Sequence, residues 1–126
     1  MTCKKIFCLL SLLSLMFVAQ SALAASVAVR QMASILLQLE HYPSIDDKVK
    51  LNEIANNKSS TKQEQVLATS VSNLKHQVAD GDKDKLKHVI DDADAPKDVR
   101  EMASIILTLR HFPSAADKAK LEQMMK

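Results

Sequence analysis

Residues 29–54 read VRQMASILLQLEHYPSIDDKVKLNEI, and the pattern returns twice at an interval of 35 residues. Residues 64–89 read EQVLATSVSNLKHQVADGDKDKLKHV, and residues 99–124 read VREMASIILTLRHFPSAADKAKLEQM. The first and third copies share 15 of 26 residues. A fixed period of this length predicts a helical-repeat architecture, because one such unit cannot bury its apolar face without neighbours.

Seven columns are identical in all three copies, and they mix apolar and polar residues. In the first half of each copy the apolar residues recur at i, i+4 and i+7, which is one face of an α-helix. The invariant alanine lies on that face, where a partner helix would come close. The seven columns are Ala33/Ala68/Ala103, Leu39/Leu74/Leu109, His41/His76/His111, Asp47/Asp82/Asp117, Lys48/Lys83/Lys118, Lys50/Lys85/Lys120 and Leu51/Leu86/Leu121.

Each outer copy divides into two predicted helices at the sequence His-x-Pro-Ser. Pro43 and Pro113 are expected to end the first helix, and Ser44 and Ser114 to cap the second. The sequence thus predicts an all-α fold of about six helices, in which three helical hairpins stack as a short α-solenoid. The repeats span residues 29–58, 64–93 and 99–126 of a single domain, residues 25–126.

The unit length is similar to that of the tetratricopeptide repeat, whose period is 34 residues. The resemblance covers period and helix–turn–helix topology only. The Trp, Gly, Tyr and final Pro of that family have no counterparts at the matching spacings, and the ankyrin T-P-L-H signature is missing from the sequence.

The second repeat differs from the outer two on one flank of its first helix. It has Ser70 and Ser72 where the first repeat has Ile35 and Leu37. We therefore expect a wetter flank on this helix than on its two counterparts.

Residues 1–24 have the pattern of a signal peptide. Lys4 and Lys5 precede an apolar run of about 14 residues, and Ala22-Leu23-Ala24 supplies the small residues that a signal peptidase needs. We expect cleavage after Ala24 and export to the periplasm, or secretion, in a Gram-negative bacterium. The alternative is a retained membrane anchor, for which the run is shorter than the roughly 20 residues required.

Composition restricts the function of the remaining chain. Both cysteines, Cys3 and Cys8, lie in the predicted signal peptide, so the mature chain would have no disulfide and no thiolate ligand. The chain has 17 basic and 15 acidic side chains, and without Lys4 and Lys5 the two signs balance. We therefore expect neither nucleic-acid binding nor membrane insertion after cleavage.

The three histidines in matching positions suggest either metal binding or a structural role. Equivalent helices in adjacent stacked repeats lie roughly 10 Å apart, so His41 and His111 are expected about 20 Å from each other, too far to share an ion. The structural alternative is that each ring bonds the last carbonyls of the first helix. We favour this role and predict no metal site. A divalent-metal site would use His41, His76, His111 and His88, the last of which lies beside Asp91, Asp92 and Asp94.

No catalytic motif or cofactor-binding motif is present in the sequence. We expect a non-enzymatic, exported protein- or peptide-binding module or adaptor, with histidine-based divalent-metal binding as the alternative.

Helical-repeat proteins recognise partners with the variable columns of an exposed face. Tyr42 and Phe112 would be interface anchors if exposed, but we expect them to be buried at the helix corner. The candidate partner-binding residues are Gln38, Glu40, Tyr42, Asn73, Lys75, Thr108, Arg110 and Phe112.

Overall fold

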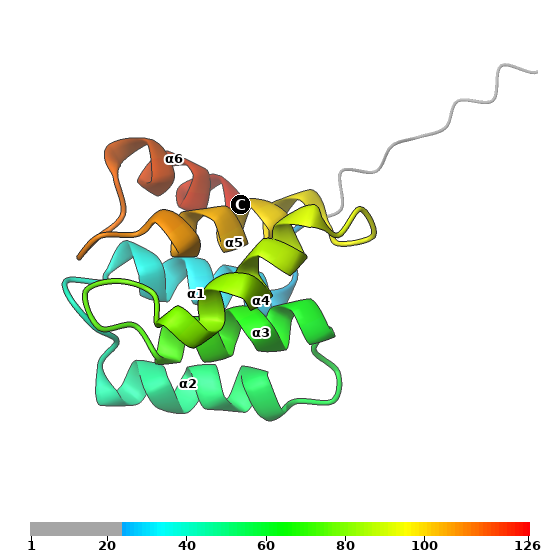
Figure 1. Ribbon diagram of the computed structural model, residues 1–126, viewed down its shortest axis with the longest axis horizontal. Coiled ribbons are helices and arrows are strands. Elements are labelled where there is room, and N and C mark those ends of the chain that lie inside the picture. Colours follow the sequence, from blue (N-terminus) through cyan, green and yellow to red (C-terminus); the bar gives the residue numbers. More distant parts are fainter. Residues whose placement is uncertain (1–23) are drawn as a thin grey trace, which may run out of the picture.

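A computed structural model describes residues 24–126, which fold into six α-helices (Figure 1). No β-strand occurs in this range, so the predicted all-α class is confirmed. Residues 1–23, which make up nearly all of the predicted signal peptide, lie outside the described residues. The helices are α1 (Val27–Leu37), α2 (Ile45–Asn56), α3 (Lys62–Ser72), α4 (Asp80–Asp91), α5 (Lys97–Thr108) and α6 (Ala115–Met124).

The helices pack as a closed ring of repeats. The first helices of the three repeats, α1, α3 and α5, contact one another, and the second helix of each repeat packs on the first helix of the next. Thus α2 lies on α3, α4 lies on α5, and α6 returns to cover α1. The linear stacking expected of a short α-solenoid is wrong in this respect, because it would have kept the first and third repeats apart.

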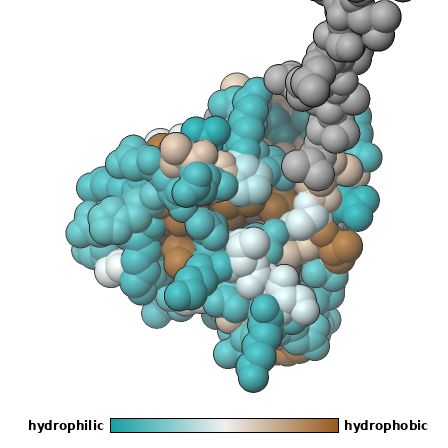
Figure 2. Space-filling model, turned by 90° about the vertical axis from the view of Figure 1, so that its right-hand side faces the viewer, coloured by the Kyte–Doolittle hydropathy of each residue, from teal (hydrophilic) through white to brown (hydrophobic). Residues whose placement is uncertain are grey.

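Fully buried alanines allow the first helices to approach each other. Ala33, Ala68 and Ala103 have no exposed surface, and the distance between packed helices depends on the size of the side chains at the contact. The remaining core comes from Met, Leu, Ile and Val side chains of all six helices, together with buried residues of the connections, among them Leu39, Leu74 and Leu109. Hydrophilic residues cover most of the end of the molecule seen in Figure 2, and hydrophobic residues show in the hollows between them.

The second helices begin where the sequence predicts, but the first helices end early. The Ser44 and Ser114 hydroxyls accept hydrogen bonds from the backbone amides of Asp47 and Asp117, as N-cap side chains do. By contrast, α1 ends at Leu37, well before Pro43. Its last turn tightens because the amides of residues 38 and 39 bond carbonyls only three residues back. Pro43 and Pro113 therefore lie in the connections within their repeats, where both residues are buried.

Three polar residues of the second repeat are buried, and two of them, Ser70 and Glu64, occupy positions that are apolar in the outer repeats. Ser70, expected on a wetter flank, is fully buried, and its hydroxyl has no hydrogen-bond partner among the described residues. Glu64 is also buried, at the position of valine in the outer repeats, but its carboxylate has hydrogen-bond partners. Its carboxylate accepts hydrogen bonds from the Ser26 hydroxyl and the Thr61 amide, so it joins the starts of α1 and α3.

None of the six helices between residues 24 and 126 is long and apolar enough to cross a membrane.

Candidate metal centre

The connections within the three repeats all lie at one end of the molecule, at the left in Figure 1. Each connection carries one histidine of the invariant column, and the rings form a cluster. Their centroids are 5.1 Å apart for His41 and His76, 5.0 Å for His76 and His111, and 5.6 Å for His41 and His111. The predicted separation of about 20 Å is wrong, because it assumed a linear stack, and the repeats close on themselves.

The ring nitrogens face one another and not the helix ends. The two Nδ1 atoms of His76 and His111 are 3.1 Å apart, and one nitrogen of each ring lies within 4.8 Å of its counterparts in the other two. All three side chains are exposed. In the described part of the chain no ring bonds a helix-end carbonyl, so the capping role expected for these histidines is wrong.

Backbone hydrogen bonds hold the three histidines in register. The His76 amide donates to the His41 carbonyl at 2.9 Å, and the His111 amide donates to the His76 carbonyl at 2.6 Å. These bonds link the connections of successive repeats and bring their rings to the same place.

His76 and His111 also adopt a strained backbone conformation. Their φ angles are +65° and +61°, the left-handed region that L-residues avoid at a cost of about 1–2 kcal/mol each. A hydrogen bond of 2.7 Å from the Phe112 amide to the Arg110 carbonyl closes a three-residue turn around His111. Such strain persists only where the surrounding structure enforces it, and it is concentrated at functional sites.

The cluster has the composition of a transition-metal site. Zinc binds imidazole nitrogen at about 2.0–2.1 Å, so two ligands of a tetrahedral ion lie about 3.3 Å apart. The spacing of the His76 and His111 nitrogens is close to that value. Within residues 24–126 the group contains three imidazoles and no carboxylate or thiol.

His88, the fourth candidate ligand, lies elsewhere. It is an exposed residue in the last turn of α4 and lines a surface hollow with Gln63 and Asp92. There the Gln63 amide donates to the Asp92 carboxylate at 2.7 Å. His88 does not join the cluster of the other three histidines.

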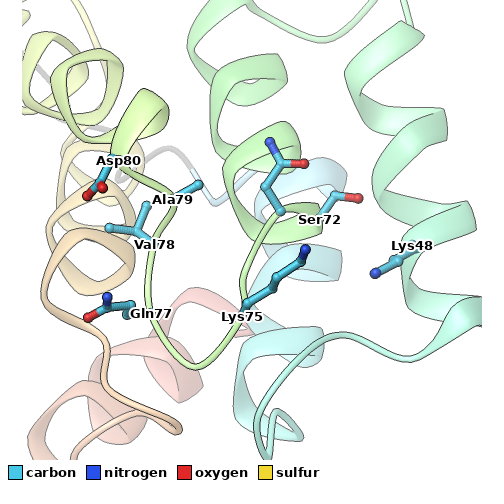
Figure 3. Close-up of a pocket in the computed structure, with 8 residues that line it drawn as sticks. Lys48, Ser72, Lys75, Gln77, Val78, Ala79 and Asp80 are labelled. Carbon is cyan, nitrogen blue, oxygen red and sulfur yellow. The ribbon is translucent and has the colours of Figure 1, made fainter.

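Two hollows of opposite character flank the histidine cluster. One lies between α2 and the connection after α3, and includes the two residues on either side of His76. Lys48 and Lys75 point into it from opposite sides (Figure 3). The other hollow is lined by His41 and the acidic residues Glu40, Asp46 and Asp47, with one lysine, Lys50.

The eight candidate partner-binding residues surround this end of the molecule, and all are exposed. Tyr42 is 63% exposed and Phe112 57%, so the expectation that they are buried at the helix corner is wrong. Three of the eight side chains form hydrogen bonds within the molecule, and one of these is the Thr108 hydroxyl, which donates to the Ser104 carbonyl of its own helix. The Asn73 amide donates to buried Asp82, and the Arg110 guanidinium donates to Gln77.

Sequence reasoning missed an exposed apolar pair on α2. Ile45 is 82% exposed and Val49 53%, four residues apart on one face of the helix. The equivalent residues are Asp80 and Asp84 in the second repeat and Ala115 and Ala119 in the third. Comparing these equivalent positions in the three repeats could have identified the pair. The second repeat has aspartates at both positions, so the packing of a repeat does not require apolar residues at them.

No family model, curated protein or solved structure matches this chain.

Proposed function

We propose that this protein binds one divalent transition-metal ion through His41, His76 and His111. The observation that carries the proposal is the convergence of three imidazoles, one from each repeat, with one nitrogen of each ring within 4.8 Å of the other two and the nitrogens of His76 and His111 3.1 Å apart. Neutral imidazole donors favour zinc, copper, nickel or cobalt over magnesium and calcium, which prefer oxygen.

The invariance of the histidines among the repeats supports the same proposal. The invariant Ala and Leu columns are buried, so packing accounts for them. The histidine column is exposed and gains nothing from burial. Because the three positions meet at one point, a single ion would need all three, which explains why the residue recurs in every repeat.

Calorimetric titration with zinc tests the proposal. The chain is used with Cys3→Ser and Cys8→Ser, so that no thiol competes for the metal. We expect one zinc per chain, and we expect His41→Gln, His76→Gln and His111→Gln each to weaken binding by about 10- to 100-fold or more.

His88→Gln is the matched control and should bind zinc as the parent does. Circular dichroism establishes that each variant remains helical. Stoichiometric binding that survives all three substitutions in the cluster, or that disappears with His88→Gln, would contradict the proposal.

A second candidate function, protein or peptide binding in the periplasm, is supported by the exposed pair Ile45 and Val49. Apolar side chains dominate the energy of interfaces when they become buried. The variant Ile45→Asp/Val49→Asp installs the residues of the second repeat and should abolish partner capture. The variant Ala115→Asp/Ala119→Asp makes the same change in the third repeat and should leave capture intact. Equal capture by both variants would count against this candidate.

We propose an exported location and a binding role without catalysis for both candidates. The export proposal is supported by the sequence pattern of residues 1–24. N-terminal sequencing of the protein recovered from the periplasm tests it, and the expected first residue is Ala25.

A further inference from the structure

We propose that the metal held by the three histidines keeps an open coordination position, and that this position takes a small anion from the side of Lys48 and Lys75. The inference rests on the proposed function and adds the class of ligand and its direction of approach.

The open position follows from the donor set. Three imidazoles leave a tetrahedral ion one ligand short, as in sites where the fourth position holds water or a bound ligand. Within residues 24–126 no carboxylate or thiol lies at coordination spacing from the three ring nitrogens. All three rings are exposed, so a ligand can reach the ion from solvent.

The charge of the site favours an anion. Three neutral imidazoles leave both positive charges of a divalent ion uncompensated, and an anionic fourth ligand reduces that charge. The acidic residues Glu40, Asp46 and Asp47 line the separate hollow beside His41, where the Lys50 amino group lies 3.9 Å from the Asp47 carboxylate.

The other hollow provides the approach. It is lined by Lys48 and Lys75, whose amino groups point into the space beside the turn that carries His76 (Figure 3). Its one carboxylate, Asp80, is paired with Lys83 at 2.6 Å. This pairing lowers the pKa of the Asp80 carboxyl, first through the hydrogen bond and then through the charge of Lys83. The two lysines of the hollow therefore face an approaching anion without a competing acid partner there.

Cobalt spectroscopy with azide as the probe tests the inference. The Cys3→Ser/Cys8→Ser chain is loaded with one cobalt ion, and its visible absorption is followed as azide is added. We expect the intense bands of a four-coordinate ion, which shift with a saturable 1:1 dependence on azide as water is replaced. Lys48→Gln/Lys75→Gln should weaken azide binding by about two- to fivefold and leave cobalt affinity unchanged. Lys87→Gln, an exposed lysine of α4 that pairs with Asp84, is the control and should change neither.

The possible failures are distinguishable. A chain that binds no cobalt would overturn the proposed function itself. Bound cobalt whose spectrum ignores azide would show that the chain supplies the fourth donor, and would overturn the open position alone. An azide affinity unaffected by Lys48→Gln/Lys75→Gln would overturn the direction of approach.

Discussion

At the scale of single residues, Ser70 shows how the second repeat departs from its neighbours. It occupies the position of Ile35 and Ile105, which are both buried. Its hydroxyl is buried without a hydrogen-bond partner in the described structure, and such a group costs about 1–3 kcal/mol of desolvation. The second repeat thus has an unfavourable residue where the outer repeats have good packing.

Ser70→Ala should therefore raise the free energy of unfolding by about 1 kcal/mol, because it removes the unsatisfied hydroxyl. Ser104→Ala, at an exposed position of α5, is the matched control and should change stability by less than about 0.5 kcal/mol. Urea denaturation followed by circular dichroism measures both. A destabilised Ser70→Ala would show that the hydroxyl is satisfied in solution.

Asp92 makes the stability of the domain sensitive to acid. A hydrogen bond from the Gln63 side chain, followed by one from the Asp94 amide, lowers the pKa of this carboxyl. Because the pKa is lower in the folded state, the ionised carboxylate stabilises the fold above the unfolded value, near 4. That contribution disappears as the pH falls through the folded value.

Asp92→Asn should consequently melt at a lower temperature than the parent at pH 7, with the difference shrinking as the pH is lowered below about 4. Asp91→Asn, at the exposed neighbouring residue, controls for the loss of one negative charge. Thermal melts between pH 7 and pH 3 give the comparison. A difference that stays constant across this range would contradict the account.

At the scale of secondary-structure elements, the sequence predicts the helices better than their ends. Apolar periodicity identifies six helices, and the serine caps place the starts of α2 and α6. The early end of α1 could not be predicted from Pro43, because it depends on the tightened bonds at residues 38 and 39. This difference matters for function, since the residues freed from the helix form the connection that carries His41.

The alanine column tests how closely the first helices pack. Ala68→Leu adds three carbons to a fully buried position on α3, which contacts both α1 and α5, and overpacking of this kind costs about 1–3 kcal/mol. Ala119→Leu makes the same change at an exposed position on α6 and should be nearly neutral. Urea denaturation of the two variants decides the point. If Ala68→Leu unfolds at the same urea concentration as the parent, this column is not a close contact.

At the scale of the whole molecule, the repeats were predictable but their closure was not. A period of 35 residues shows that the three units are alike, yet it does not fix the rotation from one unit to the next. That rotation decides whether His41 and His111 lie far apart, as in an open stack, or in contact, as in this ring. The prediction of no metal site depended on this assumption and on the helix-capping role expected for the histidines. The invariance of the three histidines was visible in the sequence, but their convergence required the packing of α6 on α1.

X-ray absorption spectroscopy of the zinc-loaded chain, with both cysteines replaced by serine, tests the central claim most directly. It counts the imidazoles on the metal and measures their distances. The account predicts three imidazole nitrogens and one oxygen ligand that is not imidazole, all at about 2.0–2.1 Å, because each repeat contributes one ring to a four-coordinate ion. A spectrum with one imidazole or none, or with six oxygen ligands, would show that the three histidines do not form a metal site.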